Sequence, residues 1–263
     1  MTETEVKTIH LQRWINIIFI SCIVIQIVLI LGDYIFNYLN IFEDISIRRI
    51  WNIAREQSLP TWFSATQTQA LGVTVILIAL VQTATLSRLK LGTWVLIGLF
   101  FLWIGIDDAA EIHEKLGGAL KRMATKNTDE PSWFVGLLLK NPSFAWHTFM
   151  APLFALCGLG IVIFLWMSFW RLKLTRYLVL GFGCWTIAQG LDFIEGLKNI
   201  DDFYDSIKAY FSIERKYGVT HTFKAIEEVL EMFGTTLLWV GFLRYFAEVS
   251  HGQQIRLLKS KSV

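Results

Sequence analysis

The chain has 263 residues, of which 54% are hydrophobic and 17% charged, with a mean hydropathy of +0.48 and a formal net charge of +2. This hydrophobic share exceeds what a soluble domain of this size needs for its core, so the composition indicates a multi-pass membrane protein. The small net charge, with no cluster of basic and aromatic residues, gives no sign of a nucleic-acid surface, and we expect no nucleic-acid partner.

Six apolar segments approach the length of about 20 residues that a helix needs to cross a bilayer. The predicted transmembrane helices comprise about residues 14–31, 62–83, 91–114, 144–170, 177–196 and 222–244. We expect an all-α fold, a polytopic membrane helix bundle in which residues 1–263 form a single transmembrane domain. The first segment lacks a small-residue cleavage site and is predicted to be a retained helix.

The short connections predict the orientation, because lysine and arginine concentrate on the cytoplasmic side of a membrane protein. Basic residues follow the second helix, the fourth helix and the sixth helix: Arg88 and Lys90, then Arg171, Lys173 and Arg176, then Arg244, Arg256, Lys259 and Lys261. Both termini are therefore expected in the cytoplasm. The longer connections, about 32–61, 107–143 and 192–221, are expected outside, with interfacial helices at 41–57 and near Trp133–Leu139.

Ionisable side chains gather near the extracytoplasmic ends of four predicted helices. They are Asp107, Asp108, Glu111, His113 and Glu114, then His147, then Asp192 and Glu195, then His221, Glu227, Glu228 and Glu231. Counted from the basic residue at the cytoplasmic end of each helix, several carboxylates lie at roughly 24–26 Å and the three histidines at roughly 35 Å. In a hydrocarbon core of about 30 Å, this places carboxylates just beneath the outer interface and imidazoles at its rim.

The angular positions predict which of these groups face one another. On a continuous helix with about 100° per residue, Asp107, Glu111 and Glu114 form one stripe, whereas His113 points nearly opposite to them. Asp108 lies about a quarter turn away from the stripe. Asp108, His113 and Glu227 are therefore weaker members of the predicted site.

Carboxylates stacked on helix faces in a low-dielectric slab repel one another, so a cation, bound protons or nearby lysines must neutralise them. The candidate lysines are Lys115, Lys198 and Lys224. Only a metal ion also explains histidines at one depth. The predicted metal ligands are Asp107, His147, Asp192, Glu195, His221, Glu228 and Glu231, and their oxygen and imidazole donors suit a divalent metal, with Zn or Fe expected.

The predicted function is a metal-dependent membrane enzyme of hydrolase type that acts on a lipid or another amphiphile, with Glu111 or Glu114 as the catalytic base. In gathering acids and histidines from several helices, the pattern resembles the transmembrane zinc hydrolases of the alkaline ceramidase and adiponectin receptor type. Their seven-helix pattern and paired His-x-x-x-His are absent, so the sequence does not indicate membership.

Other functions fit the same residues. A di-iron oxidase acting on a lipid or a quinone-type substrate needs two metals at the site. A transporter or channel subunit binds a cation or a proton there, and a subunit of a larger membrane complex or a homo-oligomer satisfies the acids with a neighbour. In each case we expect a multi-pass protein of the cell membrane, with the site facing the extracytoplasmic side.

Overall fold

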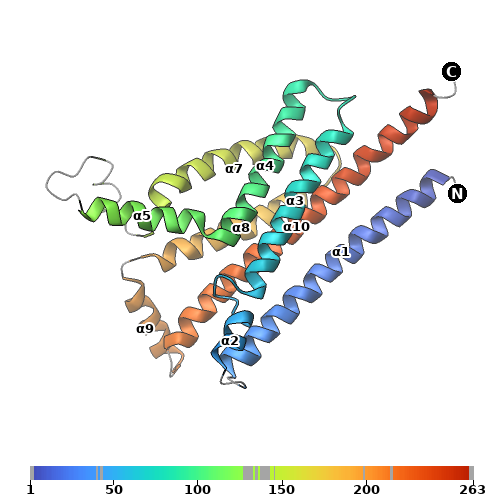
Figure 1. The fold of residues 1–263 in the computed structure, drawn as a ribbon. Helices are drawn as coiled ribbons and strands as arrows, with labels where there is room; N and C mark the ends of the chain where they lie inside the picture. The colour runs from blue at the N-terminus through green and yellow to red at the C-terminus, as the bar shows by residue number, and fades with distance from the viewer. Residues whose placement is uncertain are drawn as a thin grey trace.

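The computed structural model describes residues 3–39, 41, 44–126, 133, 136, 143–144, 146–197, 199–213 and 216–260. Within these residues the fold is all-helical, which confirms the all-α part of the predicted fold class (Figure 1). The elements are α1 (Glu3–Asp33), the π-helix η1 (Tyr34–Tyr38), α2 (Ile45–Trp51), α3 (Leu59–Val81), α4 (Arg88–Ala110), α5 (Ile112–Lys126), α7 (Trp146–Trp170), α8 (Thr175–Glu195), α9 (Ile200–Tyr210) and α10 (Lys216–Ser260).

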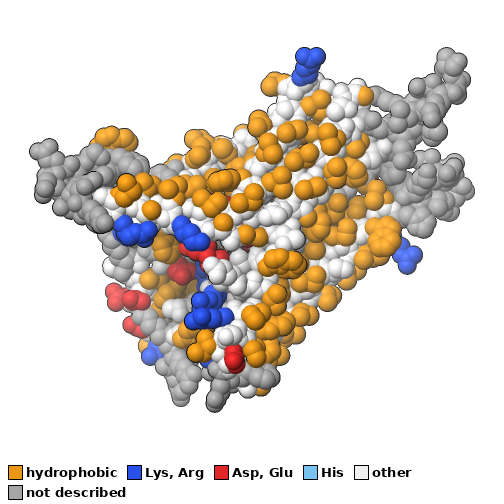
Figure 2. Space-filling model, in the orientation of Figure 1, with side chains coloured by type: hydrophobic (Ala, Val, Ile, Leu, Met, Phe, Trp, Pro, Cys, Tyr) orange, Lys and Arg blue, Asp and Glu red, His pale blue; other side chains and the backbone are white. Residues whose placement is uncertain are grey.

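Among the described residues, five segments are long and apolar enough to cross a membrane. They are Leu11–Tyr38, Leu59–Val81, Arg88–Ala110, Met150–Trp170 and Thr175–Glu195. Hydrophobic side chains cover much of the face seen in Figure 2, whereas its visible acidic side chains lie toward the end that carries α2, α5 and α9. This distribution is consistent with a multi-pass membrane protein. The sixth predicted segment, 222–244, lies inside α10 and is not among the five.

Serine caps explain why two helices begin earlier than their apolar pattern suggests. Ser58 Oγ accepts a hydrogen bond from Thr61 N at 3.3 Å, and Pro60 follows within the first turn of α3. Ser87 Oγ accepts from Lys90 N at 3.5 Å at the start of α4. Both side chains satisfy backbone donors that a helix start leaves unpaired, which fixes the two helix starts.

The longest helix, α10, lies at the centre of the bundle and packs against α1, α3, α8 and α9. Glycines allow the closest approaches between helices. A Cβ atom on Gly98 of α4 would lie 2.9 Å from the carbonyl oxygen of Gly72 in α3, and one on Gly234 of α10 would lie 2.8 Å from the carbonyl oxygen of Gly181 in α8. These two crossings set the spacing of the helices around the site.

The end of the bundle nearest the two termini is filled by an apolar core. Its buried side chains include Leu71, Val75, Ile78, Trp94, Phe101, Leu165, Phe169, Leu178, Leu238, Phe242 and Tyr245. Towards the middle of the bundle, Thr236 Oγ1 accepts hydrogen bonds from Gln26 Nε2 at 2.7 Å and Gln67 Nε2 at 2.6 Å. Because α1, α3 and α10 supply these three side chains, the bonds tie the central helices together below the acidic end.

The structure corrects the expectation of one continuous helix over 91–114. Glu111 adopts the left-handed conformation, with φ 53° and ψ 41°, so α4 ends at Ala110 and α5 begins at Ile112. Among the described residues of the expected interfacial segment, 41 and 44–57, the helix is α2 at Ile45–Trp51. The patch Trp133–Leu139 lies, except for Trp133 and Gly136, outside the described residues.

Candidate functional site

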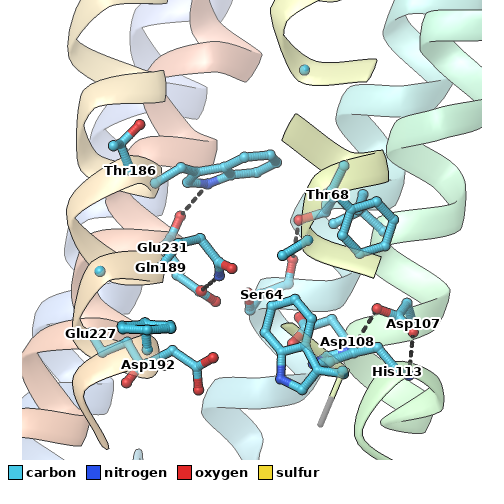
Figure 3. Close-up of a pocket in the computed structure, with 18 of the residues that line it drawn as sticks. Ser64, Thr68, Asp107, Asp108, His113, Thr186, Gln189, Asp192, Glu227 and Glu231 are labelled. Carbon is cyan, nitrogen blue, oxygen red and sulfur yellow. Dashed lines mark hydrogen bonds and ion pairs between the residues drawn. The ribbon is translucent and has the colours of Figure 1, made fainter. Parts of the chain in front are cut away.

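A pocket of about 570 Å³ lies among α3, α4, α7, α8 and α10, at the end of the bundle remote from the termini. One part of its lining is polar: Glu56, Asp107, Asp108, His113, Glu114, His147, Asp192, Lys224, Glu227, Glu228 and Glu231. The other part is apolar and includes Phe100, Ile104, Phe154, Ile161, Phe182 and Trp185. Figure 3 shows Asp107, Asp108 and His113 on one side of the pocket and Asp192, Glu227 and Glu231 on the other.

The break at Glu111 folds His113 back onto Asp107. Asp107 Oδ1 accepts a hydrogen bond from His113 N at 2.9 Å, and Asp107 Oδ2 lies 2.6 Å from His113 Nδ1. Burial lowers the pKa of His113, but the hydrogen bond to Asp107 and the charge of Asp107 outweigh it, so the pKa is raised above its ordinary value. The expectation that His113 points away from Asp107 is therefore wrong, because it assumed an unbroken helix.

On the opposite wall, α7 brings His147 against Asp192 of α8. His147 Nε2 lies 3.3 Å from Asp192 Oδ2, and this buried oxygen accepts no hydrogen bond from the described part of the chain. Two donors bound at about 2.1 Å to one metal ion are separated by roughly 3.0–3.4 Å. This spacing therefore suits two ligands of a single ion as well as it suits an ion pair.

Trp146 adds a second unsatisfied polar atom to the same wall. Its ring stacks on His147 with centroids 3.9 Å apart, and its buried Nε1 has no hydrogen-bond partner within the residues that the structure describes. Buried polar groups in proteins are nearly always paired. A buried acceptor on Asp192 and a buried donor on Trp146, both from residues that line one pocket, therefore indicate a place for a ligand.

Lys224 of α10 lies close to several carboxylates of α8 and α10. Its Nζ donates to Glu227 Oε1 at 2.7 Å and lies 3.8 to 3.9 Å from carboxylate oxygens of Asp192, Glu195 and Glu228. Lys224 therefore neutralises part of the cluster, as the sequence allowed. Lys115 instead lies 3.8 Å from Glu111, and Lys198 lies outside the described residues.

Glu56 is a pocket residue that the sequence did not reveal. It follows α2 in the connection to α3 and joins Asp108 and Glu114 in the lining. Burial, and then the charges of Glu114 and Glu111, raise the pKa of Glu56 from 4.5 to about 7. Its only sequence signal was an acid in a loop predicted to lie on the same side of the membrane as the other acids.

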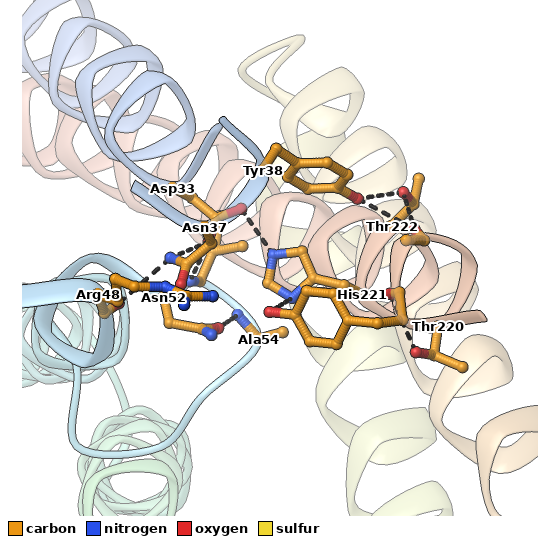
Figure 4. A network of polar contacts seen from close by, with 12 residues as sticks. Asp33, Asn37, Tyr38, Arg48, Asn52, Ala54, Thr220, His221 and Thr222 are labelled. Atoms are coloured by element: carbon orange, nitrogen blue, oxygen red, sulfur yellow. Dashed lines mark hydrogen bonds and ion pairs between the residues drawn. The ribbon is translucent and has the colours of Figure 1, made fainter. Parts of the chain in front are cut away.

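His221 does not line the pocket and belongs to a separate polar network (Figure 4). His221 Nε2 lies 2.8 Å from Asp33 Oδ2 at the end of α1, and Tyr217 Oη lies 3.3 Å from His221 Nδ1. Asp33 Oδ1 accepts hydrogen bonds from Asn37 Nδ2 at 3.0 Å and Ile53 N at 3.1 Å. The sequence did not reveal Asp33 as a partner, although an acid at the end of an apolar segment was a possible signal.

The structure thus brings most, but not all, of the predicted site residues together. Those that line the pocket are Asp107, Asp108, His113, Glu114, His147, Asp192, Glu227, Glu228 and Glu231. Glu195 contacts Lys224 without lining the pocket, Glu111 pairs with Lys115, and His221 pairs with Asp33. Among the described residues, no group of three or more histidine, cysteine or acidic side chains already stands in a metal-binding arrangement.

These features define a class of protein: a helix bundle with several segments able to span a membrane and an acidic, aromatic-lined pocket among them. A family model described as a domain of unknown function, DUF8692, matches residues 21–246, and the chain belongs to this family. The matched segment contains the whole pocket and the Asp33–His221 pair. No curated protein and no solved structure matches the chain.

Proposed function

We propose that this protein is a metal-dependent membrane enzyme of hydrolase type that acts on a lipid or another amphiphile. In this proposal α10 supplies a sixth transmembrane segment, both termini are cytoplasmic, and the pocket faces the extracytoplasmic interface. Figure 1 supports the even number of crossings, because the N- and C-termini lie at the same end of the molecule.

The observation that carries the proposal is the two-part lining of the pocket. Carboxylates and imidazoles line one part, and Phe100, Phe154 and Phe182 belong to the apolar part. A pocket of this kind suits a ligand with a polar head and a hydrocarbon chain. The apolar core around Trp94, Phe169 and Phe242 fills the bundle towards the termini, which favours a binding pocket over a continuous conduction path.

His147 and Asp192 are the residues best arranged to hold a metal ion. Lys224 approaches Asp192 through Oδ1, at 3.9 Å, which leaves Oδ2 available to an ion shared with His147 Nε2. Glu228 lies in the same pocket and is the proposed further ligand, whereas Glu231 accepts a hydrogen bond from Gln189 Nε2. A bound zinc or iron ion supplies a Lewis acid and a water of lowered pKa.

Two groups of the chain are placed to handle protons. Glu114 lines the pocket and is the proposed base for the attacking water. His113, held by Asp107 through two contacts, is placed to give a proton to the leaving group. Trp146 Nε1, which has no hydrogen-bond partner among the described residues, is the proposed donor to an oxygen of the substrate.

A second candidate function is amphiphile or proton binding without chemistry, in a transporter or in a subunit of a larger complex. The observation that favours it is Lys224, which already neutralises carboxylates on α8 and α10 without a metal ion. The two candidates differ in whether the purified protein retains a metal.

The test is elemental analysis of protein purified in detergent without chelators. We expect wild type to retain near-stoichiometric zinc or iron and Asp192→Ala and His147→Ala to lose it. Asp202→Asn is the matched control, because Asp202 is exposed on α9, outside the pocket. The metal proposal is refuted if the wild-type protein carries no metal. It is also refuted if the Asp192→Ala variant, purified as a monodisperse protein, retains as much metal as wild type.

A further inference from the structure

We infer that the head group taken by the pocket is a cationic amine and not a phosphate, sulfate or other anion. This inference rests on the proposed function for the amphiphilic nature of the ligand, and it adds the charge of the polar head. It stands on three observations: the balance of charge in the lining, the position of Lys224, and the buried carboxylate and aromatic ring on the α7–α8 wall.

The lining carries many more acids than bases. Eight carboxylates face the pocket, from Glu56, Asp107, Asp108, Glu114, Asp192, Glu227, Glu228 and Glu231, whereas Lys224 is the one lysine and no arginine contributes among the described lining residues. Proteins recognise phosphates and sulfates with arginine, lysine and backbone N–H groups. An anionic head would meet charges of its own sign here.

Lys224 balances only one side of the pocket. Its ion pairs reach Asp192, Glu195, Glu227 and Glu228, and within the described part of the chain none reaches Asp108 or Glu231. Glu231 Oε1 receives a neutral donor, Gln189 Nε2, at 3.1 Å. Figure 3 shows Asp108 and Glu231 on opposite sides of the pocket, so an ammonium group between them would meet a carboxylate on each side.

The α7–α8 wall completes the recognition. Asp192, which is 6% exposed, adds a buried carboxylate to this wall, and its Oδ1 lies 3.9 Å from Lys224 Nζ. Trp185 of α8 lines the pocket as well, and the faces of aromatic rings attract cations. Because a desolvated ammonium needs acceptors and benefits from aromatic faces, this wall is better suited to an amine than to an anion.

Photo-crosslinking with three matched probes tests the inference. The probes are derivatives of dodecylamine, dodecanol and dodecyl sulfate, each with the same diazirine beside the head group. Each probe is added to the protein in nanodiscs of zwitterionic lipid, and the labelled peptides are mapped after irradiation. We expect the amine probe to label peptides of α8 and α10 at least about tenfold more than the sulfate probe, with competition by unlabelled dodecylamine. Glu231→Gln and Asp108→Asn should each reduce this preference, whereas Asp202→Asn should not.

The outcomes separate this inference from the proposal on which it rests. Equal labelling of the pocket by all three probes, or stronger labelling by the sulfate probe, overturns the amine preference and leaves an amphiphile pocket standing. Labelling confined to lipid-facing residues for every probe overturns the amphiphile pocket and the amine preference together. A preference for the amine that survives in Glu231→Gln and Asp108→Asn overturns the assigned head position.

Discussion

At the scale of single residues, the site depends on where the backbone departs from a regular helix. Glu111 adopts the left-handed conformation, so α5 leaves the direction of α4. On a continuous helix His113 would point away from Asp107, whereas after this turn its Nδ1 lies beside Asp107 Oδ2. A non-glycine residue in this region is uncommon and costs about 1 kcal/mol or more. The Asp107–His113 contacts, at 2.9 and 2.6 Å, help to hold the chain in this turn.

The raised pKa of Glu56 predicts that the stability of the protein depends on pH. Its folded-state pKa of about 7 lies above its ordinary value of 4.5, so the folded state holds the proton more tightly than the unfolded state does. The stabilisation due to this proton is complete below the ordinary pKa and is lost as pH rises through the folded pKa. Thermal unfolding between about pH 5 and pH 8 should therefore show a smaller loss of stability for Glu56→Gln than for wild type. Parallel curves would refute a raised pKa for this side chain.

Replacement of His221 is expected to lower the stability of the protein without changing its metal content. His221→Ala leaves the buried Asp33 carboxylate without its imidazole partner, which should cost about 3 kcal/mol. Because His221 lies outside the pocket, the purified variant should keep the metal content of wild type. Thermal unfolding and elemental analysis of one preparation measure both quantities. A loss of metal as complete as that in Asp192→Ala would instead make His221 a ligand.

Part of the site was predictable at this scale. Depth counting along apolar segments grouped Asp192, Glu228 and Glu231, which line one pocket in the structure, because position along a regular helix follows from residue number. It failed for His113, where the helix breaks, and for His221, which pairs with Asp33 from a segment far away in the sequence. Glu56 was missed because a loop residue has no periodicity to place it.

At the scale of helices, the apolar segments were predictable from hydrophobic composition. Two helix starts, those of α3 and α4, are fixed by the serine caps Ser58 and Ser87. The interior contacts between helices were less predictable, because a glycine in an apolar segment has the same sequence signal whether or not a neighbour approaches it. A Cβ atom added to Gly72, Gly98, Gly181 or Gly234 would meet a neighbouring backbone oxygen, whereas one added to Gly92 or Gly158 would meet no described atom within 4 Å.

Gly98 and Gly92, both on α4, make a matched pair for testing the α3–α4 crossing. Gly98→Ala places a methyl group 2.9 Å from Gly72 O and 2.6 Å from Ile76 Cγ1, and should destabilise the protein by about 1–3 kcal/mol. Gly92→Ala meets no atom within 4 Å and should be neutral or stabilise the helix by up to about 1 kcal/mol. Unfolding in detergent measures the difference. Equal stabilities would show that the helices do not approach as closely as described.

At the scale of the whole molecule, the polar and apolar parts of the bundle are segregated along its length. The carboxylates gather at the end with α2, α5 and α9, and the aromatic core fills the end with the termini (Figure 1). Charged groups inside a membrane are costly and are retained where they serve a binding or catalytic role. The segregation therefore favours a site that is reached from one end of the bundle only.

The most direct test of the central claim is product analysis in water enriched in heavy oxygen. Metal-loaded protein in nanodiscs is incubated with a total lipid extract and with long-chain amides and esters that carry an amine head. The account predicts an amphiphilic product that carries one oxygen atom from water, formed by wild type and not by Asp192→Ala. Metal-loaded protein that forms no water-labelled product, or a product labelled only from molecular oxygen, would contradict a hydrolase.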